Sequence, residues 1–384
     1  MSTSNMKKTR KRNLPEDALG PQEIAHRTIS DKIRNQILNG ELAPGEKLIS
    51  TLKLASLWKT SKSTAHTALN NLVKEGLLER HHGSCTYVRE SPLKLSRIGI
   101  YYDSPTVWTD DERVYYRSIQ GLLEEKLAKM GIAVAVFVDR RPELKQRLVH
   151  SELKKAIFHR EIQGLILSLS NRINLSALLR LPLPVSILGG TPGHPNRVGF
   201  DQEKYFRTLM SRLVEKGCKS VGIIAAVKPD QGLPTSPDSE IFWGIFRQEV
   251  ERSGLLTRND WIKMPEKYVT NRARYGYNEF HSLWRQREHP DAVIVYPDMA
   301  VRGVITAALE LDVHQSKDVT FCFHRNAHVD ILCPFPALWM ITDEGKVADA
   351  LIDQVRQLHE GKSVRPVLVP FGCEMMQRTV ERPS

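Results

Sequence analysis

The chain has 384 residues, of which 41% are hydrophobic and 26% are charged, and its formal net charge at pH 7 is +11. This length allows two or three domains, and the composition is ordinary for a soluble globular protein. No run approaches the roughly 18 apolar residues that span a bilayer, which excludes a membrane-embedded protein. Because Leu14-Pro15-Glu16-Asp17 stands where the apolar part of a signal peptide should begin, we expect a cytoplasmic location.

Residues 1–20 are expected to form a basic, flexible tail. Its cations lie in Lys7-Lys8-Thr9-Arg10-Lys11-Arg12, and residues 1–92 together carry 15 Lys and Arg against 9 Asp and Glu. A cationic arm beside a groove-reading helix adds phosphate contacts to DNA and makes affinity fall with salt. An isolated basic run, in contrast, more often serves as a solvated tail. Both interpretations are open at this point.

Three short helices and a hairpin are predicted next. The first helix follows from Ile24, Ile29, Ile33 and Ile37 at helical spacing before Asn39-Gly40; the second carries Leu52, Leu54, Ala55, Leu57 and Trp58; the third carries Ala65, Ala68, Leu69, Leu72 and Val73 and ends at Gly76. Two extended runs then flank His82-Gly83-Ser84. Two short helices joined by a tight polar turn allow the second of them to enter the major groove of DNA.

The strings PGEKL, SKSTAHTALNNLVKEGLLER and HHGSCTYV resemble the winged helix-turn-helix of the GntR regulators over residues 22–90. The resemblance implies that residues 21–90 bind double-stranded operator DNA. The side chains expected to face DNA lie on the second and third helices and at the tip of the wing: Ser50, Ser61, Lys62, Ser63, Thr64, His66, Thr67, His82, Gly83 and Ser84.

This chain departs from the GntR pattern in three places. The usual Pro-Ser-Glu-Arg before the second helix is replaced by residues 49–52, Ile-Ser-Thr-Leu. The Ser-Arg of the recognition helix is Ser61-Lys62, which keeps the charge but loses the bidentate fork that suits guanine. The Val-Arg that follows is Ala65-His66. The operator sequence therefore cannot be carried over from the family.

After a linker at residues 91–96, strands and helices alternate to the end of the chain. The expected strands are 97–102, 132–138, 164–170, 184–190, 220–226, 261–264, 291–297, 319–323 and 339–343, and the expected helices are 115–130, 143–160, 175–180, 202–216, 239–253, 272–287, 299–311 and 344–360. Asp201 is placed to cap the helix at 202–216. The alternation predicts parallel sheets covered on both faces, in two successive lobes of which the second holds the last helix.

Residues 97–380 resemble the periplasmic-binding-protein-like effector domain of the LacI/GalR regulators. The resemblance rests on RIGIYY, VGFDQEKYFRTLMSRLVEKGCKSVGII, PDAVIVYPDMAVRGVITAALE and RPVLVPFGCEMMQRTV. A GntR head before such a domain is the plan of the arabinose-repressor-type subgroup. The fold class expected is α/β: a winged helix-turn-helix (α+β), then a two-lobed domain with parallel sheets at 97–384. The function implied is a homodimeric, ligand-responsive repressor whose small-molecule effector, a sugar or a sugar-like compound, binds between the lobes.

Five residues are candidates for effector binding. Asp298 follows a predicted parallel strand at its carboxyl end, where ligands of open α/β sheets lie, and its alternative role is a helix cap. Tyr115 and Tyr116 begin a helix beside the same edge, with ordinary packing as the alternative. Arg272 and Tyr275 match the ligand-facing turn of the second lobe, although solvated surface explains them equally well.

The second lobe also departs from the LacI/GalR pattern. The effector-binding Arg that the family has three residues before a helix Gly is Ile241, ahead of Gly244. The family's Gly-Phe-Asp-Asp loop is replaced by residues 323–326, Phe-His-Arg-Asn. We expect Arg272 or Arg325 to supply the missing cation, or the ligand to present a more apolar face on that side.

The remaining motifs indicate neither catalysis nor a cofactor. Five scattered cysteines without a CxxC exclude a disulfide framework, and Cys322, His324, His328 and Cys333 match no standard zinc spacing, so no metal is expected. No nucleotide loop or catalytic triad is recognisable, so the protein is not expected to be an enzyme. Two alternatives stay open: a constitutive DNA-binding protein with a vestigial cleft, and a cytoplasmic ligand receptor, which would leave the winged helix unexplained.

Overall fold

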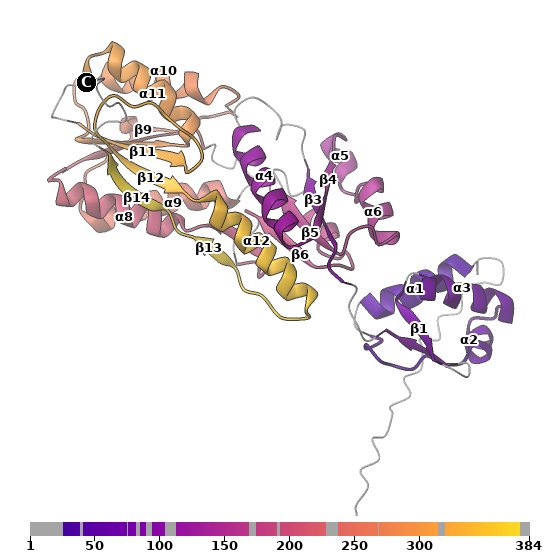
Figure 1. The fold of residues 1–384 in the computed structure, drawn as a ribbon. Coiled ribbons are helices and arrows are strands. Elements are labelled where there is room, and N and C mark those ends of the chain that lie inside the picture. The colour runs from indigo at the N-terminus through magenta and orange to yellow at the C-terminus, as the bar shows by residue number, and fades with distance from the viewer. Residues whose placement is uncertain are drawn as a thin grey trace, which may run out of the picture. The chain divides into compact units, whose positions relative to one another are not determined.

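The computed structural model describes residues 26–38, 41–74, 76–81, 85–89, 94–103, 113–168, 174–189, 193–227, 237–267, 269–313 and 319–376. The chain divides between Leu93 and Lys94 into two compact units, which are described separately (Figure 1). Within the described residues, no helix combines the length and apolar character that crossing a membrane requires. The basic tail, Ile24, Asn39-Gly40 and the wing tip at 82–84 lie outside the described residues.

The first unit contains the three predicted helices and the hairpin. These are α1 (His26–Leu38), α2 (Thr51–Leu57) and α3 (Lys62–Lys74), followed by the antiparallel strands β1 (Leu78–His81) and β2 (Cys85–Val88). The apolar faces meet in one core, where Ile29 and Ile33 of α1 are fully buried. The Ser30 hydroxyl of α1 donates to the carbonyl of Ala68 (3.1 Å), which fixes α1 against α3.

The second unit contains two six-stranded sheets. In the first sheet all strands are parallel, in the order β13-β7-β6-β5-β3-β4, with β3 at Arg97–Tyr102, β4 at Ala133–Val138, β5 at Gly164–Ser168, β6 at Val185–Leu188, β7 at Arg197–Phe200 and β13 at Val367–Val369. Helices α4 (Arg113–Lys129) and α12 (Glu344–His359) share one core with this sheet. Helices α6 (Ser151–Phe158) and α7 (Leu175–Leu178) share the other.

The second sheet has the order β14-β12-β11-β10-β8-β9. Its strands are β8 (Val221–Ala225), β9 (Ile262–Lys263), β10 (Ala292–Tyr296), β11 (Thr320–Asn326), β12 (Ala337–Thr342) and β14 (Gly372–Met376), all parallel except β14, which runs antiparallel to β12. Helices α8 (Gln202–Glu215) and α9 (Pro237–Ser253) pack on one face. Helices α10 (Arg272–Trp284) and α11 (Asp298–Glu310) pack on the other, so the predicted α/β architecture is confirmed.

The assignment of the last helix to the second lobe is wrong. Helix α12 packs against the first sheet, in one core with Ile98 and Ile100 of β3. Its apolar stripe is formed by Val347, Ala348, Leu351, Ile352 and Val355, none more than 1% exposed. The chain then adds β13 to the first sheet and β14 to the second. The lobes are therefore not successive, because each is completed by segments from the end of the chain.

Local predictions differ from the structure in smaller ways. The helix expected at 143–160 is broken into α5 (Glu143–Gln146) and α6, and at the break the Gln146 side chain donates to the carbonyl of Arg141 (2.8 Å). Strands β7, β13 and β14 were not expected from the sequence. The Asp201 cap is confirmed, because its carboxylate accepts a hydrogen bond from the amide of Lys204 (2.9 Å).

Helices α10 and α11 approach each other through glycines. A Cβ atom added at Gly303 would overlap the backbone carbonyl of Ala273, and one added at Gly276 would overlap the carbonyl of Ala300. Neither obstacle is a flexible side chain, so the helices would have to separate. Only hydrogen at these two positions permits the observed packing.

Gly303→Ala should therefore destabilise the protein, by about 1–3 kcal/mol as is typical of overpacking. Gly244→Ala is the matched control, because a Cβ at this exposed position in α9 meets nothing within 4 Å. There alanine should stabilise by up to about 1 kcal/mol through helix propensity. Urea unfolding of both variants measures the two effects, and equal stabilities would contradict the close approach of α10 and α11.

Candidate DNA-binding surface and interlobe site

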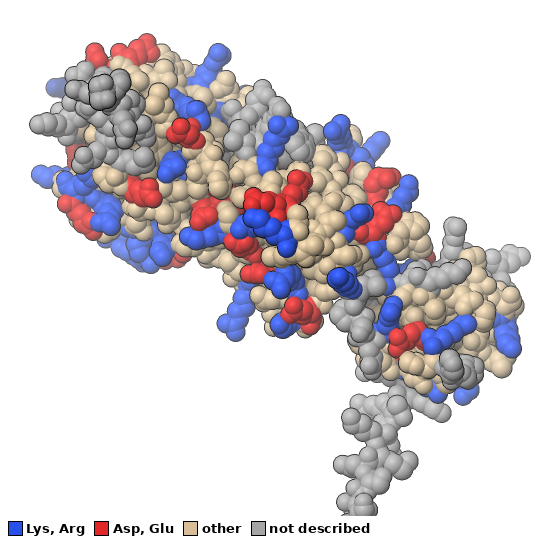
Figure 2. Space-filling model, viewed as in Figure 1, with Lys and Arg blue, Asp and Glu red and all other residues tan. Residues whose placement is uncertain are grey.

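The third helix exposes a polar face. Ala65, Ala68, Leu69 and Leu72 are buried in the core of the first unit, whereas Ser61, Lys62, Ser63, His66 and Thr67 are exposed. The visible face of this unit shows Lys and Arg over a larger area than Asp and Glu (Figure 2). An exposed helix face rich in small polar side chains, on a positively charged unit, has the chemistry needed to contact DNA edges and phosphates.

Two of the predicted DNA-facing serines also cap helices. The Ser61 hydroxyl oxygen accepts a hydrogen bond from the amide of Thr64 (3.0 Å) and lies 2.8 Å from the Thr64 hydroxyl, at the start of α3. Ser50 caps α2 by accepting from the amide of Lys53 (3.3 Å). These bonds satisfy amides that have no partner within the helix. Ser50, Ser61 and Thr64 therefore have structural roles, and their contact with DNA stays a prediction.

His66 of α3 contacts the hairpin. Its Nδ1 is 3.1 Å from the side-chain amide of Asn70, one turn further along α3, and Arg80 of β1 donates a hydrogen bond to its Nε2 (3.4 Å). The two ring nitrogens are thus engaged within the unit. The wing residues His82, Gly83 and Ser84 lie outside the described residues, so their role also stays a prediction.

Asp298 lies at the carboxyl end of β10, as predicted. It is the first residue of α11, and the capping position is held by Pro297. The carboxylate is only 4% exposed; its Oδ2 accepts a hydrogen bond from the Asn326 amide (3.0 Å), whereas its Oδ1 has no hydrogen-bond partner among the described residues. Burial raises the pKa of Asp298, although Asn326 and the nearby backbone amide of Met299 act against the shift. A buried acceptor without a donor is costly unless a ligand supplies one.

His324 fixes the backbone before Asp298. The amide of Asp298 donates to His324 Nδ1 (3.1 Å), so this nitrogen must be the acceptor and the ring proton is on Nε2. Nε2 then donates to the Thr342 hydroxyl (2.8 Å). Burial lowers the pKa of His324 to about 3, which keeps the ring neutral. His324 is therefore a structural support and not a cation for a ligand.

Aromatic side chains pack against His324, which contacts the rings of Tyr296 and Phe371. Tyr115 of α4 packs edge-on against Tyr116 and Phe200, and Phe200 contacts Phe371. The chain of rings continues through Tyr205, Tyr296 and Phe242 of the second lobe. Burial raises the pKa of Tyr115, and the nearby Tyr116, Tyr296, Glu344 and Asp298 raise it further. The charge of Asp298 in the second lobe is therefore felt at Tyr115, whose hydroxyl has no hydrogen-bond partner among the described residues.

The other predicted effector residues are placed less directly. Arg272 is buried in the first turn of α10, and Tyr275 packs against the core between the second sheet and α10 and α11. Arg325 extends to Glu374 of β14, at 3.8 Å. Ile241 is half-buried in α9. Whether Arg272 or Tyr275 contacts a ligand stays a prediction.

Several site residues were missed from the sequence. His324 and Asn326 lie within β11, where a loop had been expected, and Glu344 begins α12. Glu344 is fully buried and accepts hydrogen bonds from Ser118 (3.4 Å) and from the amide of Ala327 (2.9 Å), so it links the lobes. Polar residues at alternate positions near the end of a buried strand were the available signal for His324 and Asn326.

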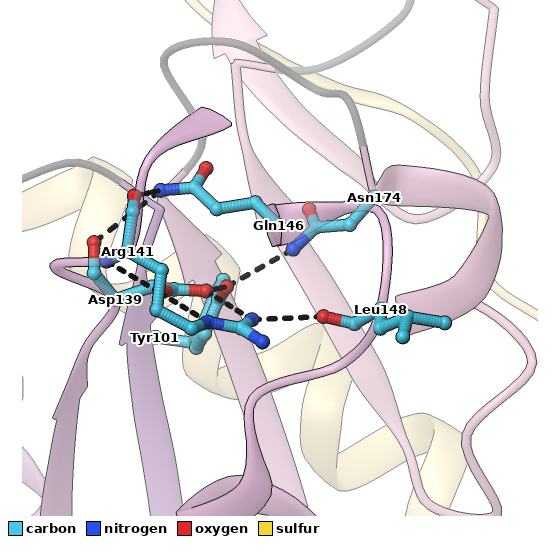
Figure 3. Close-up of polar contacts among 6 residues, drawn as sticks. All are labelled: Tyr101, Asp139, Arg141, Gln146, Leu148 and Asn174. Atoms are coloured by element: carbon cyan, nitrogen blue, oxygen red, sulfur yellow. Dashed lines mark hydrogen bonds and ion pairs between the residues drawn. The ribbon is translucent and has the colours of Figure 1, made fainter. Parts of the chain in front are cut away.

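A second polar group lies at the carboxyl ends of β3 and β4 (Figure 3). The guanidinium of Arg141 donates to both carboxylate oxygens of Asp139 (2.8 and 2.6 Å), and Tyr101 donates to the same carboxylate (2.8 Å). Asn174 in turn donates to the Tyr101 hydroxyl (3.0 Å). Burial raises the pKa of Asp139, but these hydrogen bonds outweigh it and hold the pKa below its ordinary value. The group ties β3, β4 and the start of α7 together.

Both parts of the chain are similar to known proteins. Residues 25–88 match the family model described as bacterial regulatory proteins, gntR family. The mannosyl-D-glycerate transport/metabolism system repressor MngR of Escherichia coli (strain K12) is 43% identical over 65 residues, 17% of this chain and 27% of that protein. The chain thus spans about a quarter of this relative's length.

Two further comparisons extend beyond the first unit. The arabinose metabolism transcriptional repressor of Halalkalibacterium halodurans is 20% identical over 386 residues, which cover 94% of this chain and 98% of that protein. The lac repressor dimer bound to operator and the anti-inducer ONPF has a TM-score of 0.57 at 15% identity, over 74% of this chain and 94% of that one.

The protein is thus of the class that joins a helix-turn-helix DNA-binding domain to a two-lobed α/β domain. More particularly, the first is a GntR-type domain and the second has the LacI-type, periplasmic-binding-protein-like fold.

The unfolding temperature of Asp298→Asn, measured without any ligand, distinguishes a ligand-binding role of Asp298 from a structural role. Because the pKa of Asp298 is raised in the folded protein, its stabilising contribution is fully present below the unfolded pKa of about 3.8 and is lost as pH rises through the folded pKa. At pH 7 the charged group is therefore a net cost. Asn removes the charge and still accepts from Asn326, so the variant should unfold at a higher temperature at pH 7, with no gain below pH 3.8.

Asp343→Asn is the matched control with the opposite sign. Burial raises the pKa of Asp343, but hydrogen bonds from the amide and ammonium of Lys346 outweigh it, so the pKa is lowered. This carboxylate stabilises the folded protein above its unfolded pKa and loses that effect on acidification. Asp343→Asn should therefore lower the unfolding temperature at pH 7. If Asp298→Asn also had a lower unfolding temperature, Asp298 would have a structural role.

Proposed function

We propose that the protein is a ligand-responsive, DNA-binding transcriptional repressor. The observation that carries the proposal is the joining of a GntR-type domain, with the exposed polar face of α3, to a two-lobed domain in which the buried Oδ1 of Asp298 has no partner among the described residues. Repressors are also what the names of two matched relatives describe. The presence of both domains in one chain is explained if DNA binding and ligand binding are coupled.

The DNA-binding surface is proposed to be the exposed face of α3 together with the wing. Ser63 and Thr67 are the most direct test, because they are exposed and have no capping role. Thr67→Ala should weaken binding to a duplex selected by the full-length protein by about 1–3 kcal/mol if Thr67 contacts a base, and leave a random duplex unchanged. Fluorescence anisotropy measures both. Ser61→Ala is the contrast, since its loss should appear as reduced helix stability.

The effector is proposed to bind at the interlobe group, which consists of Asp298 with its neighbours His324, Asn326, Glu344 and Tyr115. Asp298 would accept its hydrogen bonds, Tyr115 and Tyr116 would pack on its apolar face, and Arg272 and Tyr275 would complete the site from the second lobe. The Oδ1 of Asp298, which has no partner among the described residues, and the neutral His324 favour a ligand that donates hydrogen bonds at this point, such as a polyol. An anionic group placed beside Asp298 and Glu344 would be repelled.

A thermal-shift screen of the full-length protein against sugars, sugar acids and nucleosides tests the effector site. A ligand that binds only the folded state must raise the unfolding temperature. For any compound that does so, Asp298→Asn should weaken binding in calorimetry by about 1–3 kcal/mol, because the hydrogen bond loses a charged acceptor. Wild-type affinity would move the site elsewhere. A protein that binds DNA but none of the compound classes would favour the constitutive alternative.

The assembly is proposed to be a cytoplasmic homodimer. A recognition helix contacts only a short half-site, so tight binding generally needs two DNA-binding domains on a pseudo-palindromic site. The division into a tail at 1–20, a head at 21–90, a linker at 91–96 and a sensor at 97–384 is part of the same proposal. Sedimentation of the full-length protein with and without duplex tests the dimer, and a monomer on a single half-site would reject it.

A further inference from the structure

The recognition face of α3 contains no guanidinium of its own. Along Lys62–Lys74 the sequence is KSTAHTALNNLVK, so the exposed N-terminal part offers one ammonium, Lys62, and small polar groups. An ammonium is a point charge, whereas a guanidinium presents a planar fork that matches paired acceptors. A guanidinium at this surface must therefore come from another helix or strand.

The hairpin brings Arg80 to this surface. Alternate residues of a strand face the same side, and Leu78 and Val88, which are paired across the hairpin, are buried in the core under α3. Arg80 and its partner Thr86 lie on that same side, nearer the wing. Thr86 is buried but Arg80 is exposed, so the long side chain leaves the core at its rim beside α3.

Residues of α3 hold the guanidinium in position. Arg80 Nη1 donates to His66 Nε2 at 3.4 Å. Because a guanidinium can only donate, Nε2 must accept and the neutral ring has its proton on Nδ1. The proton on Nδ1 points at the side-chain amide of Asn70, 3.1 Å away. Rotating this amide by 180° exchanges its nitrogen and oxygen, so that the oxygen accepts the proton. The series Asn70, His66, Arg80 therefore joins the recognition helix to the hairpin.

The charge of Arg80 is not compensated within the described part of the unit. The neighbouring carboxylate, Glu79, is 3.0 Å from His81 and 3.9 Å from Arg89. No described Asp or Glu forms an ion pair with Arg80. One of its five N–H groups is directed at His66, which lies on the exposed face of α3 one turn after Lys62, and the others have no partner among the described residues.

We propose that Arg80 supplies the guanidinium that contacts DNA at the recognition helix, and that His66 is its positioning residue instead of a reader of bases. The ligand chemistry is a pair of acceptors on double-stranded DNA, either phosphate oxygens or O6 and N7 of guanine. The inference rests on the proposed DNA-binding function and assigns a task to two of its residues.

The first test measures the affinity of the full-length protein for two duplexes of equal length, one selected from a random pool by the wild type and one of random sequence. Arg80→Ala should weaken binding to the selected duplex about tenfold or more. If the acceptor is guanine, only the selected duplex is affected and Arg80→Lys does not restore it. If the acceptor is phosphate, both duplexes are affected, the salt slope falls by about 0.9, and Arg80→Lys restores most of the affinity.

Arg89→Ala is the matched control. It removes the same charge from the same hairpin, but Arg89 follows β2 and is directed at Glu79. Its effect on either duplex should be small. An equal loss in Arg80→Ala and Arg89→Ala would show a general effect of net charge and overturn the inference, as would wild-type affinity of Arg80→Ala for both duplexes.

The second test separates positioning from contact. His66→Ala should weaken binding in the wild type but have no further effect in the Arg80→Ala background, because its action passes through Arg80. His66→Gln should recover part of the loss, since its amide oxygen can accept from the guanidinium. A full additive effect of His66→Ala in the Arg80→Ala background would make His66 a direct contact. A wild type that binds neither duplex would remove the proposed function itself, whereas normal wild-type binding with silent Arg80 variants removes only this inference.

Discussion

The structure depends on the return of the chain from the second lobe to the first. The apolar stripe of α12 has no cover in the lobe that precedes it in sequence and is buried against β3 and α4 instead. The chain therefore passes between the lobes after β7, after β12 and after β13. Any rotation of one lobe relative to the other must bend these three connections together, which makes the lobes a coupled pair and not two independent domains.

The interlobe group lies at these connections. Glu344 begins α12 directly after the second passage and is bonded to Ser118 of the first lobe and Ala327 of the second. Phe200 and Phe371 stand at the other two passages and contact each other. A ligand that donates to Asp298 would thus act where the lobes are joined. Its binding energy can favour one arrangement of the lobes only to the extent that the contacts differ between arrangements.

Much of this was visible in the sequence, and the missing parts have physical reasons. The periodicity of Ile29 and Ile33, or of the α12 stripe, identifies a buried face, but it does not say which sheet covers that face. This is why the helices were found and α12 was assigned to the wrong lobe. Asp298 was recognised as a candidate because it follows a parallel strand, and ligands of open α/β sheets bind at the carboxyl ends of the strands.

Side-chain partners were less accessible to sequence reasoning. Ser61 and Thr64 were expected to face DNA, and their capping bond depends on where α3 begins, to within one residue. His66 was also expected to face DNA, and its contact with Arg80 requires the register of a hairpin 14 residues away. His324 and Asn326 of β11 support Asp298, which follows the neighbouring strand β10. In the sequence the two strands are separated by the crossover helix α11. Such contacts follow from the assembled sheets and not from local pattern.

The central claim is that DNA binding and ligand binding are coupled in one protein. The direct measurement is a closed cycle on the full-length protein: the Kd for the selected duplex with and without a compound that raises the unfolding temperature, and the Kd for that compound with and without the duplex. Linkage requires both ratios to be equal, and a regulator of this kind should show a factor of at least about five. A compound that binds between the lobes with the same Kd whether or not the duplex is present would contradict the account.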